Sequence, residues 1–239
     1  MSLVGEELYN AFIKNYTKKQ WNADPKDLDA SIIKRLPIRF NYDISYFNDL
    51  HQGIPVDGYT NMMLNMLNSD YIRIELGRDY TLEDLKHDND DSNVDNIVFT
   101  GPLDKLFNYK HGTLKWRSLK FETVHLSCND FQGNSCINYV DDDVPYTRIH
   151  EFKHYHPETK DSIFGTVVQY EYPNDWKVGD DMYYPVNNEE TAALQKAYLS
   201  ELRNFKKAYV GGRLGDYKYY DMDDAIASAI SMSIAFMKG

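Results

Sequence analysis

The 239-residue sequence is poor in cysteine and has no long hydrophobic run. Its two cysteines, Cys128 and Cys136, fit neither a disulfide framework nor a four-ligand zinc site. The cytoplasm, a reducing compartment, is therefore the expected location. No stretch of about 18 apolar residues occurs, and the first residues carry no signal-peptide pattern. We therefore expect neither a membrane-spanning helix nor secretion.

Basic residues are also scarce. The chain has 26 lysines and arginines against 37 aspartates and glutamates, which gives a net charge of −11. Nucleic acid is an unlikely partner for such a chain, because its binding depends on a basic surface. An anionic small ligand is still compatible, provided that individual arginines are placed next to it. Only eight arginines occur, so each can be considered separately.

Several motifs of enzymes and metal sites are missing. No G-x-S-x-G and no Ser-His-Asp ordering stands out, and no G-x-G-x-x-G occurs. A segment at 87–93 superficially resembles a calcium loop, but Asn93 and Phe99 occupy the positions that require glycine and an acid. We therefore expect the 87–93 segment to form a solvated turn. No metal site is predicted at the three clustered histidines either, since no acid stands at matching helical spacing: His150, His154 and His156.

The remaining patterns mix helices with strands. Apolar residues at helical spacing predict one helix that starts near residue 4. They predict further helices at 62–67, 189–206 and 223–237. β-Branched and aromatic content predicts strands at 71–76, 96–100, 119–126, 135–140, 148–154, 163–172 and 207–210. Four of these strands follow one another between 119 and 172 without an intervening helix. This order predicts an antiparallel sheet and an α+β fold.

Three segments carry residues suited to an anionic, aromatic ligand. Tyr16 and Trp21 flank a polar helical turn and could stack on a base or a sugar, although the spacing alone favours two core aromatics at the end of a helix. Arg35, beside a proline turn, is either a phosphate ligand or an exposed charge. Arg148 starts a predicted strand, with Asn138 on the preceding one.

A glycine turn at 211–215 separates the last predicted strand from the last helix. A strand, a glycine turn and a helix N-terminus in this order favour negative charge. The glycine spacing differs from the dinucleotide fingerprint, so this segment alone is weak support for a nucleotide site.

Taken together, these segments resemble the UDP-galactopyranose mutase family. The resemblance extends from about residue 8 to about residue 230. No single motif is decisive, but coincidence does not explain nine of them in the same order. They are Tyr16–Trp21, Asp24–Pro25, Lys34–Arg39, Gln52–Thr60, Thr100–Asp104, Arg117–Leu119, Val144–Arg148, Tyr183–Pro185 and Gly212–Asp223.

The resemblance implies an isomerase that interconverts UDP-galactopyranose and UDP-galactofuranose through attack of the reduced flavin N5 on the anomeric carbon. Arg35 and Arg148 resemble the two catalytic arginines that hold the diphosphate. Tyr16 resembles the residue that stacks on uracil, and Trp21 matches a tryptophan near the sugar. The full set of implied substrate-binding residues is Phe12, Tyr16, Thr17, Trp21, Tyr46, Asn138, Tyr184 and Tyr219.

The implied cofactor is reduced FAD, and three residues fall where the family contacts it: Arg213, Asp221 and Met222. Ile13 and Tyr220 depart from residues that are common in the family, without altering the assignment. The implied partners are the two sugar nucleotides, with a homodimer left open and with neither nucleic acid nor a membrane.

The resemblance also implies a division into domains. Residues 1–35 would end a helical domain, 36–56 and 113–184 would form the antiparallel-sheet substrate domain, and 57–112 with 185–239 would be the C-terminal parts of a flavin-binding α/β domain. Because the fingerprint that anchors the FAD diphosphate is absent from these residues, we expect a C-terminal fragment that binds no FAD and is inactive alone. A cofactor-free sugar-nucleotide-binding module and a flavin amine oxidase relative are the alternatives. The second is disfavoured, because an amine needs no diphosphate clamp.

Overall fold

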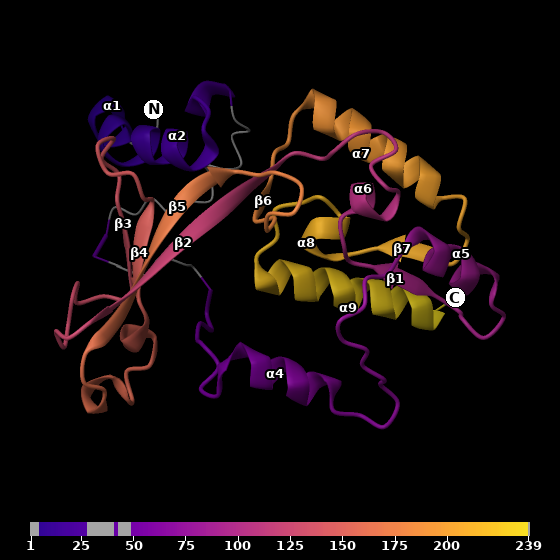
Figure 1. Ribbon diagram of the computed structural model, residues 1–239, viewed down its shortest axis with the longest axis horizontal. Helices are drawn as coiled ribbons and strands as arrows, with labels where there is room; N and C mark the ends of the chain where they lie inside the picture. The colour runs from indigo at the N-terminus through magenta and orange to yellow at the C-terminus, as the bar shows by residue number, and fades with distance from the viewer. Residues whose placement is uncertain (1–4, 28–40, 43–48, 239) are drawn as a thin grey trace. The chain divides into compact units, whose positions relative to one another are not determined.

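The computed structural model describes residues 5–27, 41–42 and 49–238, and it contains two compact units (Figure 1). Unit 1 lies within residues 1–74 and 119–174, and unit 2 within 75–118 and 175–239. Two of the predicted site residues, Arg35 and Tyr46, lie outside the described residues. The domain assignment given above stays a prediction.

Unit 1 begins with the predicted helix, which carries a π-helical stretch near its start. Ile13, Thr17, Gln20 and Trp21 are buried along it, and this spacing places them on one helical face. The helix ends at Asn22, which adopts the left-handed conformation (φ 50°) that commonly terminates helices. The helical elements of unit 1 up to residue 67 are α1 (Gly5–Leu8), η1 (Tyr9–Lys14), α2 (Asn15–Trp21), η2 (Pro25–Asp27) and α4 (Gly58–Leu67).

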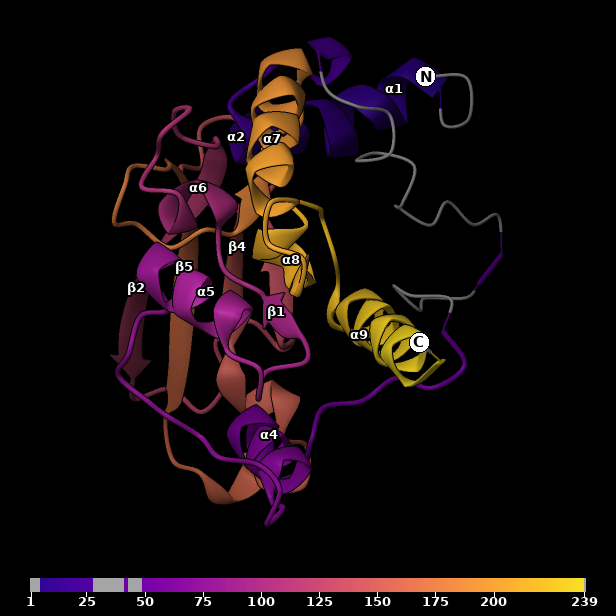
Figure 2. The same cartoon turned by 90° about the vertical axis from the view of Figure 1, so that its right-hand side faces the viewer.

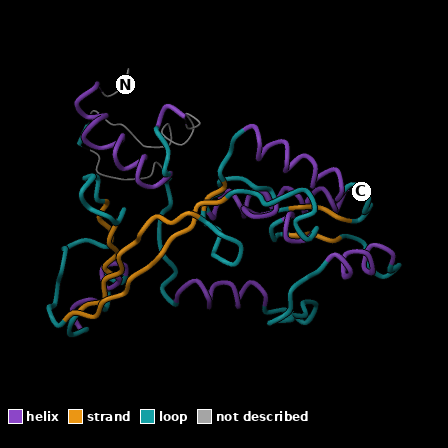
Figure 3. Tube along the Cα trace, turned by 45° about the horizontal axis from the view of Figure 1, so that its top comes forward, coloured by secondary structure: helices purple, strands orange, loops and turns teal. Residues whose placement is uncertain are grey.

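The four strands predicted in series between 119 and 172 form most of a five-stranded sheet with the order β3-β4-β5-β2-β6. Figure 3 shows β2 and β5 as its two long strands. The predicted antiparallel arrangement is confirmed for the β3–β4 and β4–β5 pairs. The bounds are β2 (Trp116–Leu126), β3 (Cys136–Asn138), β4 (Arg148–Glu151), β5 (Thr166–Asp175) and β6 (Tyr184–Pro185), with short 3-10 helices η3 (Phe152–Tyr155) and η4 (Lys160–Ser162) between β4 and β5.

Unit 2 contains a small parallel sheet, in which β1 pairs with β7. Helix α7 packs against one side of this pair and α9 lies on the other (Figures 1 and 2). The main core gathers Leu85, Ile97, Leu103, Leu106, Phe107, Tyr198 and Leu202. The elements are α5 (Leu82–Asp90), β1 (Ile97–Phe99), α6 (Leu103–Leu106), α7 (Glu189–Leu202), β7 (Ala208–Val210), α8 (Gly212–Gly215) and α9 (Met222–Lys238).

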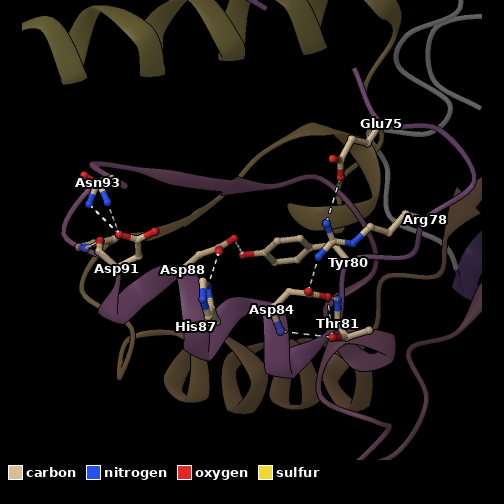
Figure 4. Close-up of polar contacts among 10 residues, drawn as sticks. Glu75, Arg78, Tyr80, Thr81, Asp84, His87, Asp88, Asp91 and Asn93 are labelled. Carbon is tan, nitrogen blue, oxygen red and sulfur yellow. Dashed lines mark hydrogen bonds and ion pairs between the residues drawn. The ribbon is translucent and has the colours of Figure 1, made fainter. Parts of the chain in front are cut away.

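Two local predictions were wrong. Residues 71–76 form no strand, and the alternating pattern there gains no partner: Tyr71 and Leu76 are 99% and 90% exposed. Residues 87–90 belong to helix α5 and not to a turn. A capping box between Thr81 and Asp84 starts this helix (Figure 4), and it overrides the turn preference of the Asp-Asn run. None of the helices in the described ranges is long and apolar enough to cross a membrane.

Candidate functional site

Two predicted site residues of the sheet, Asn138 and Arg148, lie in one row with Glu171 across three strands. Asn138 on β3 faces Arg148 on β4, which faces Glu171 on β5. The next row, two residues along, contains Cys136 and His150. Because alternate residues of a strand share a face, both rows project from the same side of the sheet. The structure therefore brings Asn138 and Arg148 together as the sequence predicted.

Arg148 is fixed by partners on both sides. Its Nη2 donates a hydrogen bond of 2.8 Å to the Tyr16 hydroxyl oxygen. Its Nε lies 3.3 Å from Oε1 of Glu171, whose side chain is only 5% exposed. Two residues predicted separately, Tyr16 on α2 and Arg148 on β4, are thus in direct contact. The guanidinium is held in place, and the Arg148 side chain is 24% exposed.

His150 adds a second positive charge beside Arg148. Interactions with the side chains of Cys136 and Glu171 raise the pKa of His150 to about 9 against the opposing effect of burial. Nε2 of the imidazole lies 3.6 Å from Glu171. Arg148 and His150 thus place two cationic groups on one face of the sheet, next to Glu171, and such groups suit a phosphate-bearing ligand.

Helix α2 is fastened to the β3–β4 connection by Lys19. Its ammonium donates to four backbone oxygens, at 2.8 to 3.0 Å, which belong to Tyr139, Asp141, Val144 and Tyr146. Burial lowers the pKa of Lys19, partly offset by the three aspartates of the connection. These bonds hold the helix that carries Tyr16 against the strand pair that carries Arg148.

The other predicted residues of α2 differ in accessibility. Phe12 is 60% exposed and Tyr16 is half-buried, as stacking on a ligand requires. Thr17 and Trp21 are 6% and 9% exposed. Their side chains pack inside unit 1, so only a small part of Trp21 is open to a ligand in this conformation.

In unit 2 the predicted residues form a second cluster. The rings of Tyr184 and Tyr219 stack at 5.5 Å with an angle of 9° between their planes. The Arg213 guanidinium lies 5.0 Å from the centre of the Tyr219 ring and 6.0 Å from that of Tyr184. It also donates to the carbonyl oxygens of Tyr183 and Tyr220. Arg213 therefore orients the tyrosine pair, whatever else it contacts.

The glycine turn of unit 2 lies where β1 and β7 end. A Cβ on Gly215 would be 2.9 Å from the Phe99 carbonyl oxygen, so glycine is needed for α8 to approach β1. Gly212 has a φ of 74° and faces Thr100. A hollow of about 390 Å³ lies between Thr100, Gly212 and a mostly apolar face of α9 that includes Ile226 and Met232. It lies at the carboxyl ends of two parallel strands, where ligands of α/β folds commonly bind.

The start of α9 carries the last two predicted cofactor residues. Asp221 and Met222 are 56% and 50% exposed. The first turn also contains Asp223 and Asp224, and Asp224 accepts a hydrogen bond from the Asp221 amide. These acids already complement part of the positive end of the helix dipole. The attraction of this terminus for a reduced, anionic flavin is therefore weaker than the sequence suggested.

Three residues of these clusters were not predicted as site residues. Lys19 is indistinguishable from Lys18 in sequence, and Glu171 is one of many acids in strand patterns. His150 was considered only as a metal ligand. Knowledge of the strand register would have identified Glu171 and His150. Glu171 faces Arg148 across the sheet, and His150 faces Cys136. Register could not be assigned from the sequence alone.

The family model and the named relatives compared with this chain point to the same family. The family model described as UDP-galactopyranose mutase matches residues 11–219. A protein named probable UDP-galactopyranose mutase from Klebsiella pneumoniae is 40% identical over 237 residues, which cover 99% of this chain and 59% of that protein. The UDP-galactopyranose mutase of Mycoplasma genitalium is 30% identical over 245 residues, 95% of this chain and 59% of the relative.

A third relative has a different sugar in its name. The dTDP-fucopyranose mutase of Escherichia coli is 36% identical over 238 residues, which cover 100% of this chain and 63% of that protein. The chain thus spans about six-tenths of the length of the curated relatives that it matches.

Proposed function

Because the chain belongs to the UDP-galactopyranose mutase family, we propose that the protein of which it forms part interconverts UDP-galactopyranose and UDP-galactofuranose. The observation that supports this proposal most directly is the fixed Arg148, in contact with Tyr16 and flanked by the charged His150. An arginine, a second cation and an accessible aromatic ring suit a nucleoside diphosphate. A cytoplasmic location belongs to the same proposal.

The chain's own residues would act mainly on the diphosphate. In this proposal, Arg148 and Arg35 neutralise the charge that develops on UDP as it leaves the anomeric carbon. Tyr16, with Phe12 beside it, holds the base, and Tyr184 and Tyr219 bond the diphosphate. Positioning the anomeric carbon lowers the barrier without a strong acid or base from the protein.

The cofactor in this proposal is FAD. The residues at the glycine turn and the adjoining hollow fit part of a flavin, and Arg213, Asp221 and Met222 would contact it there. When bound and reduced, FAD supplies the nucleophile for the anomeric carbon. The remaining FAD contacts would come from a dinucleotide-binding fingerprint, which these 239 residues lack. We therefore propose that the chain alone is inactive, and that 57–112 with 185–239 are parts of a flavin-binding domain.

Turnover tests this function. The product of the complete open reading frame, supplied with FAD and dithionite, is incubated with UDP-galactofuranose, and UDP-galactopyranose is quantified by chromatography. We expect conversion in the reduced protein and none in the oxidised one. Parallel reactions with dTDP-fucofuranose distinguish the two sugar nucleotides that the relatives' names contain. Preferred turnover of the dTDP sugar would contradict the proposed substrate while retaining the reaction class.

The alternative is a sugar-nucleotide-binding module without catalysis. It predicts that the complete gene product binds UDP-galactopyranose, as measured by calorimetry, yet converts neither isomer when FAD and reductant are present. The same calorimetric titration with Arg148→Ala is informative for both hypotheses, since each assigns Arg148 to the diphosphate.

A further inference from the structure

A half-buried histidine of unit 1, His154, lies between two carboxylates, away from the Arg148 row. Asp130 is in the loop after β2, Glu151 ends β4, and His154 is in η3. One ligand atom from each lies within 4.8 Å of the others. Sequence spacing alone does not single out this group, because Asp130 is 24 positions from His154 and only the fold places it there.

The two distances from His154 match the separation of neighbouring ligands around a metal ion better than a short hydrogen bond. His154 Nε2 lies 3.4 Å from Asp130 Oδ1 and 3.4 Å from Glu151 Oε2. Charge-assisted hydrogen bonds are shorter, about 2.7–2.9 Å. Ligands that are about 2.0–2.1 Å from a tetrahedral zinc ion are separated by about 3.3–3.4 Å. Among the side-chain atoms of the described ranges, Nε2 is one of four that are buried without a hydrogen-bond partner.

The two carboxylates are already oriented by the surrounding backbone. Glu151 is fully buried, and its oxygens accept hydrogen bonds from the amides of Phe131 and Gln132 and from the Thr166 hydroxyl. Asp130 Oδ1 accepts from the Gly133 amide at 2.6 Å. The two oxygens nearest His154, Glu151 Oε2 and Asp130 Oδ1, each accept only one of these bonds and keep a further lone pair. The bonds therefore orient the ligands without using up the oxygens that face the histidine. Such second contacts are typical of metal ligands.

The donor set selects the class of cation. Two carboxylates contribute a charge of −2, which one divalent cation balances. An imidazole nitrogen favours zinc and similar transition metals, whereas calcium takes 6–8 oxygen ligands and magnesium about six. A hollow of about 180 Å³ adjoins Asp130 and His154, and leaves room for a water molecule as fourth ligand.

Lys153 and Lys160 line the same hollow, and Lys153 is engaged by the backbone. The Lys153 ammonium donates to the carbonyl oxygens of Asn129, Ile163 and Gly165, at 2.7 to 3.0 Å. Its three protons are therefore directed at the backbone. These bonds hold the 129–133 loop and the segment before β5 in the arrangement that brings the three ligands together.

We propose that Asp130, Glu151 and His154 bind a divalent transition-metal ion, with zinc as the best fit. This assignment departs from the absence of a metal site that the sequence predicted. The ion would cross-link the 129–133 loop, the end of β4 and η3, and its affinity would stabilise the folded chain.

Cobalt(II) is a suitable spectroscopic probe, because it occupies zinc sites and absorbs visible light when tetrahedral. The 239-residue chain, first treated with a chelator, is titrated with cobalt(II) and then with zinc(II), and bound metal is counted after gel filtration. We expect one ion per chain, visible cobalt bands that zinc abolishes, and a higher melting temperature with zinc. His154→Gln and Asp130→Asn should each weaken binding at least about tenfold.

His156→Gln is the matched control, since His156 is a nearby histidine whose side chain is 42% exposed and contacts Glu158. It should bind cobalt as the unmodified chain does. The proposal is overturned if the chain retains no metal, or if His154→Gln and Asp130→Asn bind it undiminished. A sulfur-to-cobalt charge-transfer band would also overturn it, because that band would place the ion at Cys128 or Cys136. Asp130 is 54% exposed, so Asp130→Asn tests the site without disturbing the core.

Discussion

Arg148 illustrates how one side chain is prepared for a ligand by its neighbours. It contacts Tyr16 from a different helix and Glu171 from the adjacent strand, and these partners restrict its rotamers in advance. A guanidinium can serve both contacts because its donors point in fixed, divergent directions. A lysine ammonium at the same position would have to give up one of them.

Arg148→Lys is therefore expected to lower kcat/KM of the complete gene product by about 10²-fold, since one oriented donor to the developing charge is worth about 3 kcal/mol. The measurement is steady-state turnover of UDP-galactofuranose with reduced FAD. Arg203→Lys is the control, an exposed arginine at the end of α7, and it should leave turnover unchanged. Near-normal turnover of Arg148→Lys would argue against a role in holding the diphosphate.

Lys19 stabilises the same region without contacting the row of site residues. Lys19→Met removes a charged donor from four carbonyl oxygens and should lower the free energy of unfolding by about 2 kcal/mol. Urea denaturation of the 239-residue chain measures this change. Lys18→Met, on the exposed neighbouring residue, is the matched control and should change stability by less than about 0.5 kcal/mol. Equal effects of the two variants would contradict the clamp role of Lys19.

At the scale of elements, α5 depends on its first turn. The Thr81 side chain accepts from the Asp84 amide, and the Asp84 carboxylate accepts from the Thr81 amide and hydroxyl and from Arg78 (Figure 4). The core residue Leu85 follows directly. A helix rich in charged residues thus begins at a defined residue and presents Leu85 and the partly buried Leu82 to the core.

Thr81→Ala removes one half of this capping box and should lower the free energy of unfolding by about 1 kcal/mol. Thr81→Ser keeps the hydroxyl oxygen and should recover most of the loss. Thermal denaturation followed by circular dichroism at constant pH compares the two variants. Equal losses of stability in Thr81→Ala and Thr81→Ser would show that the Thr81 capping hydrogen bond makes no measurable contribution to the free energy of unfolding.

Asp84 gives α5 a pH dependence. Hydrogen bonds from the Thr81 side chain, the Thr81 amide and Arg78 lower its pKa from 3.8 to about 2. The folded state therefore favours the ionised form, so this stabilisation is present above pH 3.8 and is lost as the pH falls towards 2. Asp84→Asn should make the melting temperature less dependent on pH in this window. Glu83→Gln, an 81% exposed acid of the same turn, serves as control and should leave the dependence unaltered.

At the scale of the whole chain, flavin binding is expected to distinguish the 239 residues from the complete gene product. The flavin contacts proposed at the glycine turn of unit 2 are not accompanied by a fingerprint for the FAD diphosphate, which is absent from the 239 residues. We therefore predict that the purified chain, incubated with excess FAD, shows no flavin absorption after gel filtration. The complete gene product, treated identically, should retain the band. Flavin retained by the chain alone would show that contacts other than the fingerprint suffice for binding.

The sequence by itself determined the family, the antiparallel sheet and most element positions. Nine short motifs in order are a property of the chain, and helix and strand periods follow from local chemistry. The same local information failed at 71–76 and 87–90, where the absence of a partner strand and the presence of a cap decide the conformation. Asp104 shows a further limit: it belongs to a family motif, yet it is fully buried and accepts hydrogen bonds from the amides of Lys105 and Leu114.

Only the tertiary structure decided which residues act together. Strand register places Glu171 beside Arg148 and Cys136 beside His150, helix packing brings Tyr16 to the Arg148 guanidinium, and a loop brings Asp130 to His154. These pairs are 14 to 132 positions apart along the chain, and a sequence pattern encodes only neighbours within a turn or a strand. The physical reason is that side-chain contacts across strands depend on alignment. The order of residue types along the chain identifies the family, whereas the alignment of strands and helices decides which residues form the site.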